Sequence, residues 1–240
     1  MKTLIVPDVH NHIDEVEAQI SRYPADRVVF LGDYFDSFGD TPAMAEATAR
    51  WLKASLARPE RLHLWGNHDL WYRFPLNSQI CWIGSGFTPE KSRAISGVLA
   101  FEDWEKLRLV TVLDGIVFSH AGVDRSVFEH PVEGLSAGRV ESQCAAALED
   151  AAAGIDNEVL GEHGIVWLRW WEMEALPEFS QVVGHTVARE CRVETEGGRF
   201  NVCLDTLGRY LGLLEDGIFK VIDDERDGAM VWSSADPPAG

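Results

Sequence analysis

The sequence predicts an α/β layered fold, and two observations carry this prediction. Short apolar runs rich in β-branched residues alternate with segments of helical pattern between residues 4 and 65, which is typical of strands and helices in layers. Each apolar run stops abruptly at polar residues, as in Leu4-Ile5-Val6 before Asp8 and His10. The ends of strands in an open α/β sheet are where ligands usually bind, so the same pattern predicts a site.

The first two predicted strands, over residues 4–6 and 27–31, belong to one β-α-β unit. Residues 14–20 between them are expected to form a helix that Asp14 caps, with acidic residues in the first turn, where the helix dipole favours them. A helix that joins two buried strands makes them parallel, with a right-handed crossover.

A second helix and a third strand continue this alternation. Thr41 and Pro42 predict a helix over residues 42–57, because threonine caps helices and proline fits the first helical position. The third strand covers residues 61–65 and ends at Gly66-Asn67-His68-Asp69. Strands and helices therefore alternate through the first quarter of the chain.

Residues 70–110 interrupt the alternation, since they are rich in aromatic residues and broken by proline and glycine. We expect an irregular insertion beside the mouth of the site, with a helix near residues 101–108. The pattern leaves open whether the insertion forms a lid or only covers the core.

Strand patterns return after residue 110, and a helix is expected over residues 136–153. Apolar runs precede Ser119-His120 and Gly184-His185. Four predicted antiparallel strands, separated by tight-turn signals, cover residues 191–194, 199–204, 209–214 and 218–222. The acidic residues 223–240 are expected to form a frayed C-terminal tail, which leaves one domain over residues 1–222.

Composition limits the classes of function. Of the 240 residues 46% are hydrophobic, and no apolar run approaches the ~20 residues of a membrane span. The net charge of −18 argues against a non-specific nucleic-acid binder, although bound cations would still permit attack on a phosphate. The cysteines have no CxxC spacing, so we expect reduced thiols and a cytoplasmic protein; they are Cys81, Cys144, Cys191 and Cys203.

Five polar clusters, each after an apolar run, form the candidate site. They are Asp8-x-His10, Gly32-Asp33-x-x-Asp36, Gly66-Asn67-His68-Asp69, Ser119-His120-Ala121-Gly122 and Gly184-His185-Thr186. A lone histidine after a strand is usually structural, and His63, within the third strand, is assigned no role. Five such clusters are hard to attribute to chance. Carboxylate, imidazole and amide oxygen together favour a divalent metal site, and the absence of cysteine from the set disfavours structural zinc.

This ordered series of clusters resembles the metallophosphoesterase superfamily, the calcineurin-like phosphoesterases. Within it, Gly184-His185-Thr186 and the later Leu204-Asp205-Thr206 are most similar to phosphoprotein phosphatases, notably small bacterial and phage enzymes. The resemblance implies two mixed β-sheets packed as a sandwich and flanked by helices. It also implies hydrolysis of a phosphate ester by water that two divalent metal ions activate.

The resemblance further implies a role for each cluster. Asp8, His10 and Asp33 would hold the first metal ion, and Asp33, Asn67, His120 and His185 would hold the second, with Asp33 as the bridge. Asn67 would also contact the substrate. His68 would be the general acid that protonates the leaving alkoxide, oriented by Asp36. Mn²⁺ is the expected metal, and Fe, Zn, Ni and Co fit the same ligands.

Two positions, Ser37 and Asp69, depart from the phosphoprotein phosphatase pattern, and Val187 differs from other members of the superfamily. Ser37 stands where an arginine usually holds the substrate phosphate, so Arg169 is the remaining candidate for that role, with a salt bridge as the alternative. Asp69 replaces the usual glutamate. Val187 stands where superfamily nucleases and diesterases often have a second histidine. The loss of one arginine is expected to weaken the binding of a dianionic phosphomonoester, and it leaves the substrate class open.

The sequence thus predicts a metal-dependent phosphoesterase, first of all a phosphomonoesterase of the serine/threonine protein phosphatase type. Its partner would be a phosphoprotein or a small phosphoester, with no membrane and with nucleic acid disfavoured. One alternative is a nucleotide-directed hydrolase that acts on a dinucleoside polyphosphate, a cyclic nucleotide or a nucleic-acid end, with Trp71 placed to stack on a base. An inactive binding scaffold is disfavoured, because all the expected ligands and the His68–Asp36 pair are present.

Overall fold

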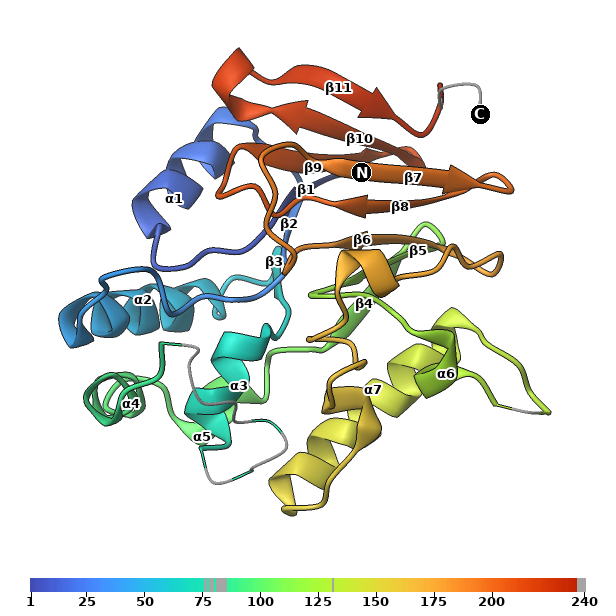
Figure 1. Cartoon of the computed structure of the whole chain (residues 1–240). Coiled ribbons are helices and arrows are strands. Elements are labelled where there is room, and N and C mark those ends of the chain that lie inside the picture. The colour runs from blue at the N-terminus through green and yellow to red at the C-terminus, as the bar shows by residue number, and fades with distance from the viewer. Residues whose placement is uncertain (76, 78–79, 81–85, 131, 237–240) are drawn as a thin grey trace.

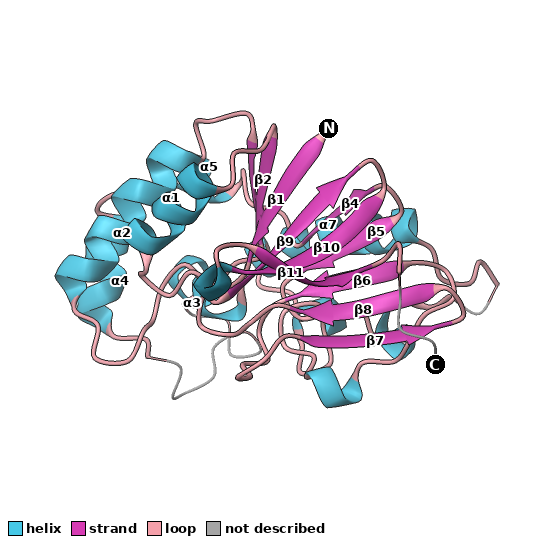
Figure 2. Cartoon of the chain, turned by 90° about the horizontal axis from the view of Figure 1, so that it is seen from above, coloured by secondary structure: helices cyan, strands magenta, loops and turns pink. Residues whose placement is uncertain are grey.

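Two β-sheets pack face to face, and helices cover their outer faces (Figures 1 and 2). The computed structural model describes residues 1–236 except 76, 78, 79, 81–85 and 131. The first sheet contains, in spatial order, β11 (Ala229–Ser233), β10 (Ile218–Asp223), β9 (Tyr210–Glu215), β1 (Lys2–Val6), β2 (Arg27–Phe30) and β3 (Arg61–His63). The second contains β4 (Val110–Leu113), β5 (Ile116–Ser119), β6 (Ser180–Val183), β8 (Arg199–Cys203) and β7 (Arg192–Glu196).

Both sheets are mixed, as predicted. β1 pairs with β2 in parallel and with β9 antiparallel. In the second sheet, β5 and β6 are parallel, whereas β4 and β5 are antiparallel. The parallel pairs bring the carboxyl ends of β1, β2 and β3 to one edge of the first sheet, and those of β5 and β6 to one edge of the second.

The alternation of side chains along each strand creates an apolar layer on both sides of the sheets. Ile5 and Val29 of the first sheet pack against Phe118 of the second, between the sheets. Their neighbours Leu4 and Phe30 point to the opposite face, toward the helices. Each side chain of this size contributes roughly 1.5–3 kcal/mol when it is fully buried, so the sandwich supplies a rigid frame for the loops at its edge.

The helices are short and most begin at a recognisable cap. They are α1 (Ile13–Arg22), α2 (Pro42–Ser55), α3 (Asn67–Arg73), α4 (Pro89–Ser96), α5 (Phe101–Trp104), α6 (Arg125–Phe128) and α7 (Ala137–Ala152), with 3₁₀ turns η1 (Glu158–Leu160), η2 (Trp170–Glu172) and η3 (Asp224–Arg226). Thr41 caps α2 by accepting a hydrogen bond from the backbone N–H of Met44, as predicted. The predicted cap of the first helix is wrong: His12 is the N-cap, and Asp14 lies in the first turn.

The insertion over residues 70–110 is more regular than expected, although residues 76, 78, 79 and 81–85 lie outside the described part. α4 and α5 form within it, and α4 packs against α2. Thr88 and Pro89 start α4 as Thr41 and Pro42 start α2: the Thr88 hydroxyl accepts a hydrogen bond from the N–H of Lys91 at 3.2 Å. The Thr88-Pro89 pair is thus a cap signal that the sequence itself carries.

Two expectations for the C-terminal region need correction. The four late strands form two hairpins in different sheets, because residues 204–209 carry the chain from β8 across to β9. The prediction of a frayed tail is wrong for residues 224–233, since η3 forms there and β11 pairs with β10. Residues 237–240 lie outside the described part.

Cys144, Cys191 and Cys203 are free thiols, and Cys81 lies outside the described residues. Within the described part of the chain, none of the helices combines the length and the apolar character that a membrane crossing requires.

Candidate metal centre and acid pair

All five polar clusters meet where the edges of the two sheets come together. Asp8 and His10 follow β1, and Asp33 follows β2. Asn67 begins α3 after β3, and two further histidines follow β5 and β6. The first sheet thus supplies the carboxylates and the amide, and the second sheet supplies His120 and His185.

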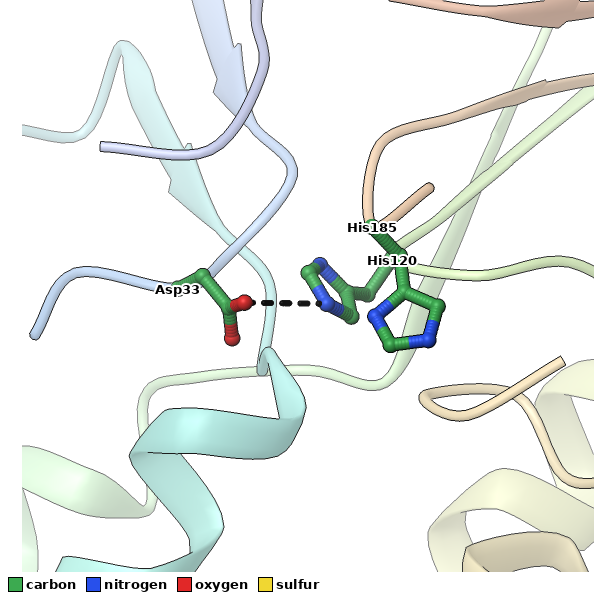
Figure 3. A group of neighbouring side chains, drawn as sticks. All are labelled: Asp33, His120 and His185. Atoms are coloured by element: carbon green, nitrogen blue, oxygen red, sulfur yellow. Dashed lines mark ion pairs between the residues drawn. The ribbon is translucent and has the colours of Figure 1, made fainter. Parts of the chain in front are cut away.

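Asp33 belongs to both of the groups that can hold a metal ion. Asp8, His10 and Asp33 form one group, and Asp33, His120 and His185 form the other, with the ligand atoms of each group within 4.8 Å of one another. Figure 3 shows the His120 and His185 rings on one side of the Asp33 carboxylate. The His120 Nε2 lies 3.4 Å from Asp33 Oδ2, and the His10 Nε2 lies 3.8 Å from the same oxygen. Each group offers oxygen and imidazole nitrogen, which suits divalent cations.

Asn67 joins the second group through its amide oxygen. Its Oδ1 lies 2.9 Å from His120 Nε2, and both residues are buried. This places the amide oxygen beside the same ring nitrogen that faces Asp33. The structure therefore brings together all six side chains that the sequence analysis singled out as ligands.

Main-chain carbonyls fix which nitrogen of each histidine ring faces the centre. A carbonyl oxygen only accepts hydrogen bonds, so the ring nitrogen that contacts it must carry the proton, and its partner nitrogen is free to bind metal. The donating nitrogens are His120 Nδ1 to Leu31 (2.9 Å), His10 Nδ1 to Phe35 (3.0 Å) and His185 Nε2 to Trp167 (3.1 Å). These bonds leave three nitrogens aimed inward as ligands.

Glycines make room for the carboxylates. A Cβ added at Gly66 would lie 2.1 Å from Asp33 Oδ1, and one at Gly184 would lie 2.0 Å from Asp8 Oδ1. The backbone is also strained at the site, with positive φ angles at His10 (42°), Asp33 (50°), Asp36 (65°) and His185 (64°). Non-glycine residues rarely adopt this region, and such outliers concentrate at functional sites.

Burial and neighbouring charges together shift the pKa values of the carboxyl and imidazole groups at the centre. Burial raises the pKa of Asp8. Burial would also raise the pKa of Asp33, but the neighbouring rings of His120 and His68 lower it. Burial lowers the pKa of His120, and the Asp33 carboxylate outweighs this and raises it to about 9. Buried carboxylates in such numbers require positive charge nearby, and divalent cations on these donors would supply it.

His68 and Asp36 form a pair at the rim of the centre. The His68 Nδ1 lies 3.1 Å from Asp36 Oδ2, and the His68 side chain is 21% exposed. Its backbone N–H donates to Asp33 Oδ1 at 3.0 Å. Burial lowers the pKa of His68, but the Asp33 and Asp36 carboxylates raise it to about 9. A protonated imidazole with one edge open to solvent can deliver a proton to a bound group.

Asp69 lies outside both candidate ligand groups and instead binds two backbone amides. Its Oδ1 accepts a hydrogen bond from the Tyr34 N–H at 2.8 Å, and its Oδ2 accepts one from the Gly66 N–H at 2.9 Å. Asp69 is fully buried. It therefore ties the loop after β2 to the loop after β3, and the shorter aspartate reaches both amides.

Arg169 lies beside the second group and forms no ion pair with the residues that the structure describes. It precedes η2, and its backbone N–H donates to the Glu172 carboxylate at 3.3 Å. Burial, His120 and then the Arg169 charge lower the pKa of His185, so the guanidinium is near that ring. A salt bridge was the alternative role for Arg169, and no described acidic side chain pairs with it. Its role in phosphate binding stays a prediction.

Sequence reasoning missed three buried residues near the centre. Tyr72 and Lys91 both contact Asp36, and nothing in their sequence context marks them. Asp205 follows β8 and is buried; burial, then Asp8, raises its pKa to about 7. Its position after a strand is visible in the sequence, where Leu204-Asp205-Thr206 indicated only the resemblance to phosphoprotein phosphatases.

Comparison with known proteins agrees with this geometry. The family model described as calcineurin-like phosphoesterase matches residues 1–194. A search of curated proteins finds no match. Among solved structures, a cold-active protein-tyrosine phosphatase of a psychrophilic Shewanella species is similar, with a TM-score of 0.62, 16% identity, and coverage of 95% of this chain and 79% of that one.

A second similar structure is a protein serine/threonine phosphatase from Saccharomyces cerevisiae. It has a TM-score of 0.52 and 14% identity, and the match covers 91% of this chain and 72% of that chain. At such identities the structural matches show a shared fold. The family model adds the family, so the resemblance drawn from the motifs is confirmed at that level.

Proposed function

The chain belongs to the calcineurin-like phosphoesterases, which are metal-dependent phosphoester hydrolases, and we propose that it is a phosphomonoesterase acting on phosphoserine or phosphothreonine of a protein, or on a small phosphoester. The observation that carries the proposal is the His68–Asp36 pair, 3.1 Å apart, at the rim of the centre built on Asp33. An alkoxide is a poor leaving group, so an enzyme for such esters needs an acid at this place.

The residues for the metal ions follow from the two groups that share Asp33. The first ion would be held by Asp8, His10 and Asp33, and the second by Asp33, Asn67, His120 and His185. Divalent ions held by these residues would supply a bound water of lowered pKa as the nucleophile and would polarise the phosphoryl oxygens. Mn²⁺ is the proposed metal, because the donors are oxygen and imidazole without sulfur.

The two ring nitrogens of His68 have different roles in the proposed reaction. The Asp36 carboxylate accepts the hydrogen bond from Nδ1, which leaves Nε2 to give its proton to the leaving oxygen. The carboxylate also stabilises the cationic ring before transfer. A positioned acid of this kind contributes about 10²–10⁴-fold to the rate.

Arg169 is proposed to hold the substrate phosphate. A guanidinium can donate two parallel hydrogen bonds to phosphate oxygens. Ser37, which stands where an arginine is usual, has a hydroxyl 3.3 Å from the Asn11 amide nitrogen. Of the two positions where the family usually has a phosphate-binding arginine, 37 and 169, this chain has an arginine only at 169.

Hydrolysis of a nucleotide-type substrate is the second candidate, and Ser37 is the observation that favours it. With one arginine fork instead of two, the preference for a dianionic monoester over a diester is weaker. Against it, Trp71 is only 4% exposed and packs in the apolar core, so its face is not open to a base. We therefore place this reaction second.

Turnover of p-nitrophenyl phosphate and bis-p-nitrophenyl phosphate tests the proposal. The protein is stripped of metal with a chelator and assayed before and after addition of Mn²⁺. Metal-restored turnover of the monoester, followed by turnover of phosphopeptides, would support the proposal. A preference for the diester would move the assignment to nucleotide substrates. Turnover of neither substrate with any of the candidate metals would contradict a phosphomonoesterase.

A further inference from the structure

Lys91 is a buried ammonium group that reaches the acid pair from the insertion. It lies in α4, and its side chain is 3% exposed. Its Nζ is 2.6 Å from Asp36 Oδ1 and 3.0 Å from both carboxylate oxygens of Asp40. Lysine is almost never fully buried unless it is paired, so the contacts explain how the charge is tolerated there.

The two oxygens of the Asp36 carboxylate have different partners. Lys91 and the Tyr72 hydroxyl both donate to Oδ1, whereas Oδ2 faces His68 Nδ1 at 3.1 Å. Two donors on one oxygen prevent the carboxylate from turning, and this keeps the other oxygen aimed at the imidazole. Asp36 itself has a φ of 65°, a backbone conformation that non-glycine residues rarely adopt.

Gly86 of the insertion also lies close to the Asp36 side chain. Gly86 has a φ of 89°, and a Cβ added there would lie 3.1 Å from the Asp36 Cβ. Asp40, the second partner of Lys91, accepts a hydrogen bond from the Asn11 amide at 3.2 Å. Lys91 therefore connects the insertion to the loops after both β1 and β2.

The Lys91 ammonium is the shared ion-pair partner of two buried carboxylates, Asp36 and Asp40. A buried charge is costly without a partner. Removal of the ammonium would therefore destabilise both carboxylates where they stand and would release the Asp36 side chain from its fixed orientation toward His68.

We propose that Lys91 is a positioning residue for the general acid, so that helix α4 of the insertion fixes the Asp36 carboxylate that orients His68. The inference rests on the proposed function, since it assumes that His68 protonates the leaving group. Helix α4 of the insertion then supports the catalytic apparatus through Asp36. A purely structural Lys91 would hold α4 on α2 and leave leaving-group selectivity unchanged.

The test compares Lys91→Met with the wild type on p-nitrophenyl phosphate and on an alkyl phosphate, both with Mn²⁺. The p-nitrophenyl group leaves with little protonation, whereas an alkoxide requires it. We expect kcat for the alkyl ester to fall about 10–100-fold, the range for residues that support a catalytic ligand, with a smaller loss for the p-nitrophenyl ester. Metal content stays unchanged. Lys53→Met is the matched control, because Lys53 pairs with Asp103 at 2.9 Å with its side chain 48% exposed.

A second variant covers the case in which Lys91→Met does not fold. Tyr72→Phe removes only the other donor to Asp36 Oδ1 and should shift selectivity in the same direction by a smaller factor. Equal losses on both esters, or no loss in either variant, would overturn the inference while wild-type turnover still supports the proposed function.

Inactivity of the wild type would instead overturn the proposed function, and an activity-independent readout then decides the role of Lys91. The ¹⁵N resonances of the His68 ring in the zinc-loaded protein report whether Nδ1 carries the proton that faces Asp36. A change of that signal in Lys91→Met, absent in Lys53→Met, supports positioning. An unchanged signal rejects it.

Discussion

His63 and His120 are both buried imidazoles at the end of a strand, and their surroundings give them opposite properties. His63 is stacked on Phe30 with ring centroids 4.4 Å apart, and its nitrogens contact the hydroxyls of Tyr34 and Ser55. Burial, then the charge of Arg61, lowers its pKa to about 3. Burial also lowers the pKa of His120, but Asp33 raises it to about 9.

The difference shows that burial alone does not mark a histidine as a candidate metal ligand. Both rings lose the solvation of their charged form. The nearby groups decide the outcome: hydroxyls and an aromatic face at His63, and a carboxylate 3.4 Å away at His120. A ring among carboxylates belongs to a cation site, whereas a ring among hydroxyls belongs to the core. The predictions below test this contrast from both sides.

Asp33→Asn should have the largest effect, because the residue is shared by both ligand groups. The amide keeps the shape of the side chain but removes the charge that both ions need. We expect metal content, measured by elemental analysis after dialysis, to fall at both positions and turnover to fall to background. Asp216→Asn is the matched control, since Asp216 lies in an exposed turn with a φ of 52° that asparagine also tolerates. Full metal content in Asp33→Asn would contradict the shared role.

His68→Asn should have the second largest effect and should separate acid chemistry from metal binding. His68 contacts Asp36 and lies outside both ligand groups. We expect unchanged metal content and a loss of about 10²–10⁴-fold in kcat for alkyl esters. The loss should be smaller for p-nitrophenyl phosphate, whose leaving group needs less protonation. Equal losses on both substrates would argue against a general acid.

The sequence indicated the candidate ligands that the structure brings together, but not the residues that support them. Asp8, Asp33 and His120 follow strands of apolar pattern, so their meeting at one edge follows from topology. Lys91 lies in a helix of the insertion, and its contact with Asp36 spans 55 residues of chain. Local pattern carries no information on such a contact, because it depends on how α4 packs on α2.

The same limit applies to the contrast between the two histidines. His63 stands within an apolar run as His120 stands after one, and the contacts that tell them apart include groups from other segments, Tyr34 for His63 and Asp33 for His120. The hairpins after residue 191 were predicted from their turns, yet their division between two sheets depends on long-range pairing. The sequence thus predicts elements and candidate ligands, whereas the packed structure is needed to find the neighbours of each side chain.

Arg169→Ala should have an intermediate effect that is confined to substrate binding. A charge-assisted hydrogen bond contributes about 1.5–3 kcal/mol, so we expect KM for p-nitrophenyl phosphate to rise about tenfold or more, with metal content and stability unchanged. Arg199→Ala is the control, because Arg199 is exposed at the start of β8 and its guanidinium donates a hydrogen bond to the Pro177 carbonyl at 3.2 Å. A loss of stability at normal KM would restore the salt-bridge interpretation.

His63→Gln should have the smallest effect on turnover and should instead change the pH dependence of folding. Glutamine retains donor and acceptor atoms for Tyr34 and Ser55. The ring titrates near its ordinary pKa of 6.5 when unfolded and near 3 when folded. Between these values the unfolded chain binds the extra proton, so stability rises with pH.

The stabilising contribution of neutral His63 is therefore fully present above pH 6.5 and is lost as the pH falls toward 3. The wild type should lose about 1.4 kcal/mol of unfolding free energy per pH unit in this window through His63 alone, and His63→Gln should lack that slope. Denaturant unfolding of the chelator-treated proteins between pH 7 and pH 5 measures the difference, with the same metal-free state on both sides. Parallel slopes would mean that the folded ring accepts a proton as readily as the unfolded one. His63 would then resemble His120, and the distinction between a core histidine and a ligand histidine would have to rest on geometry alone.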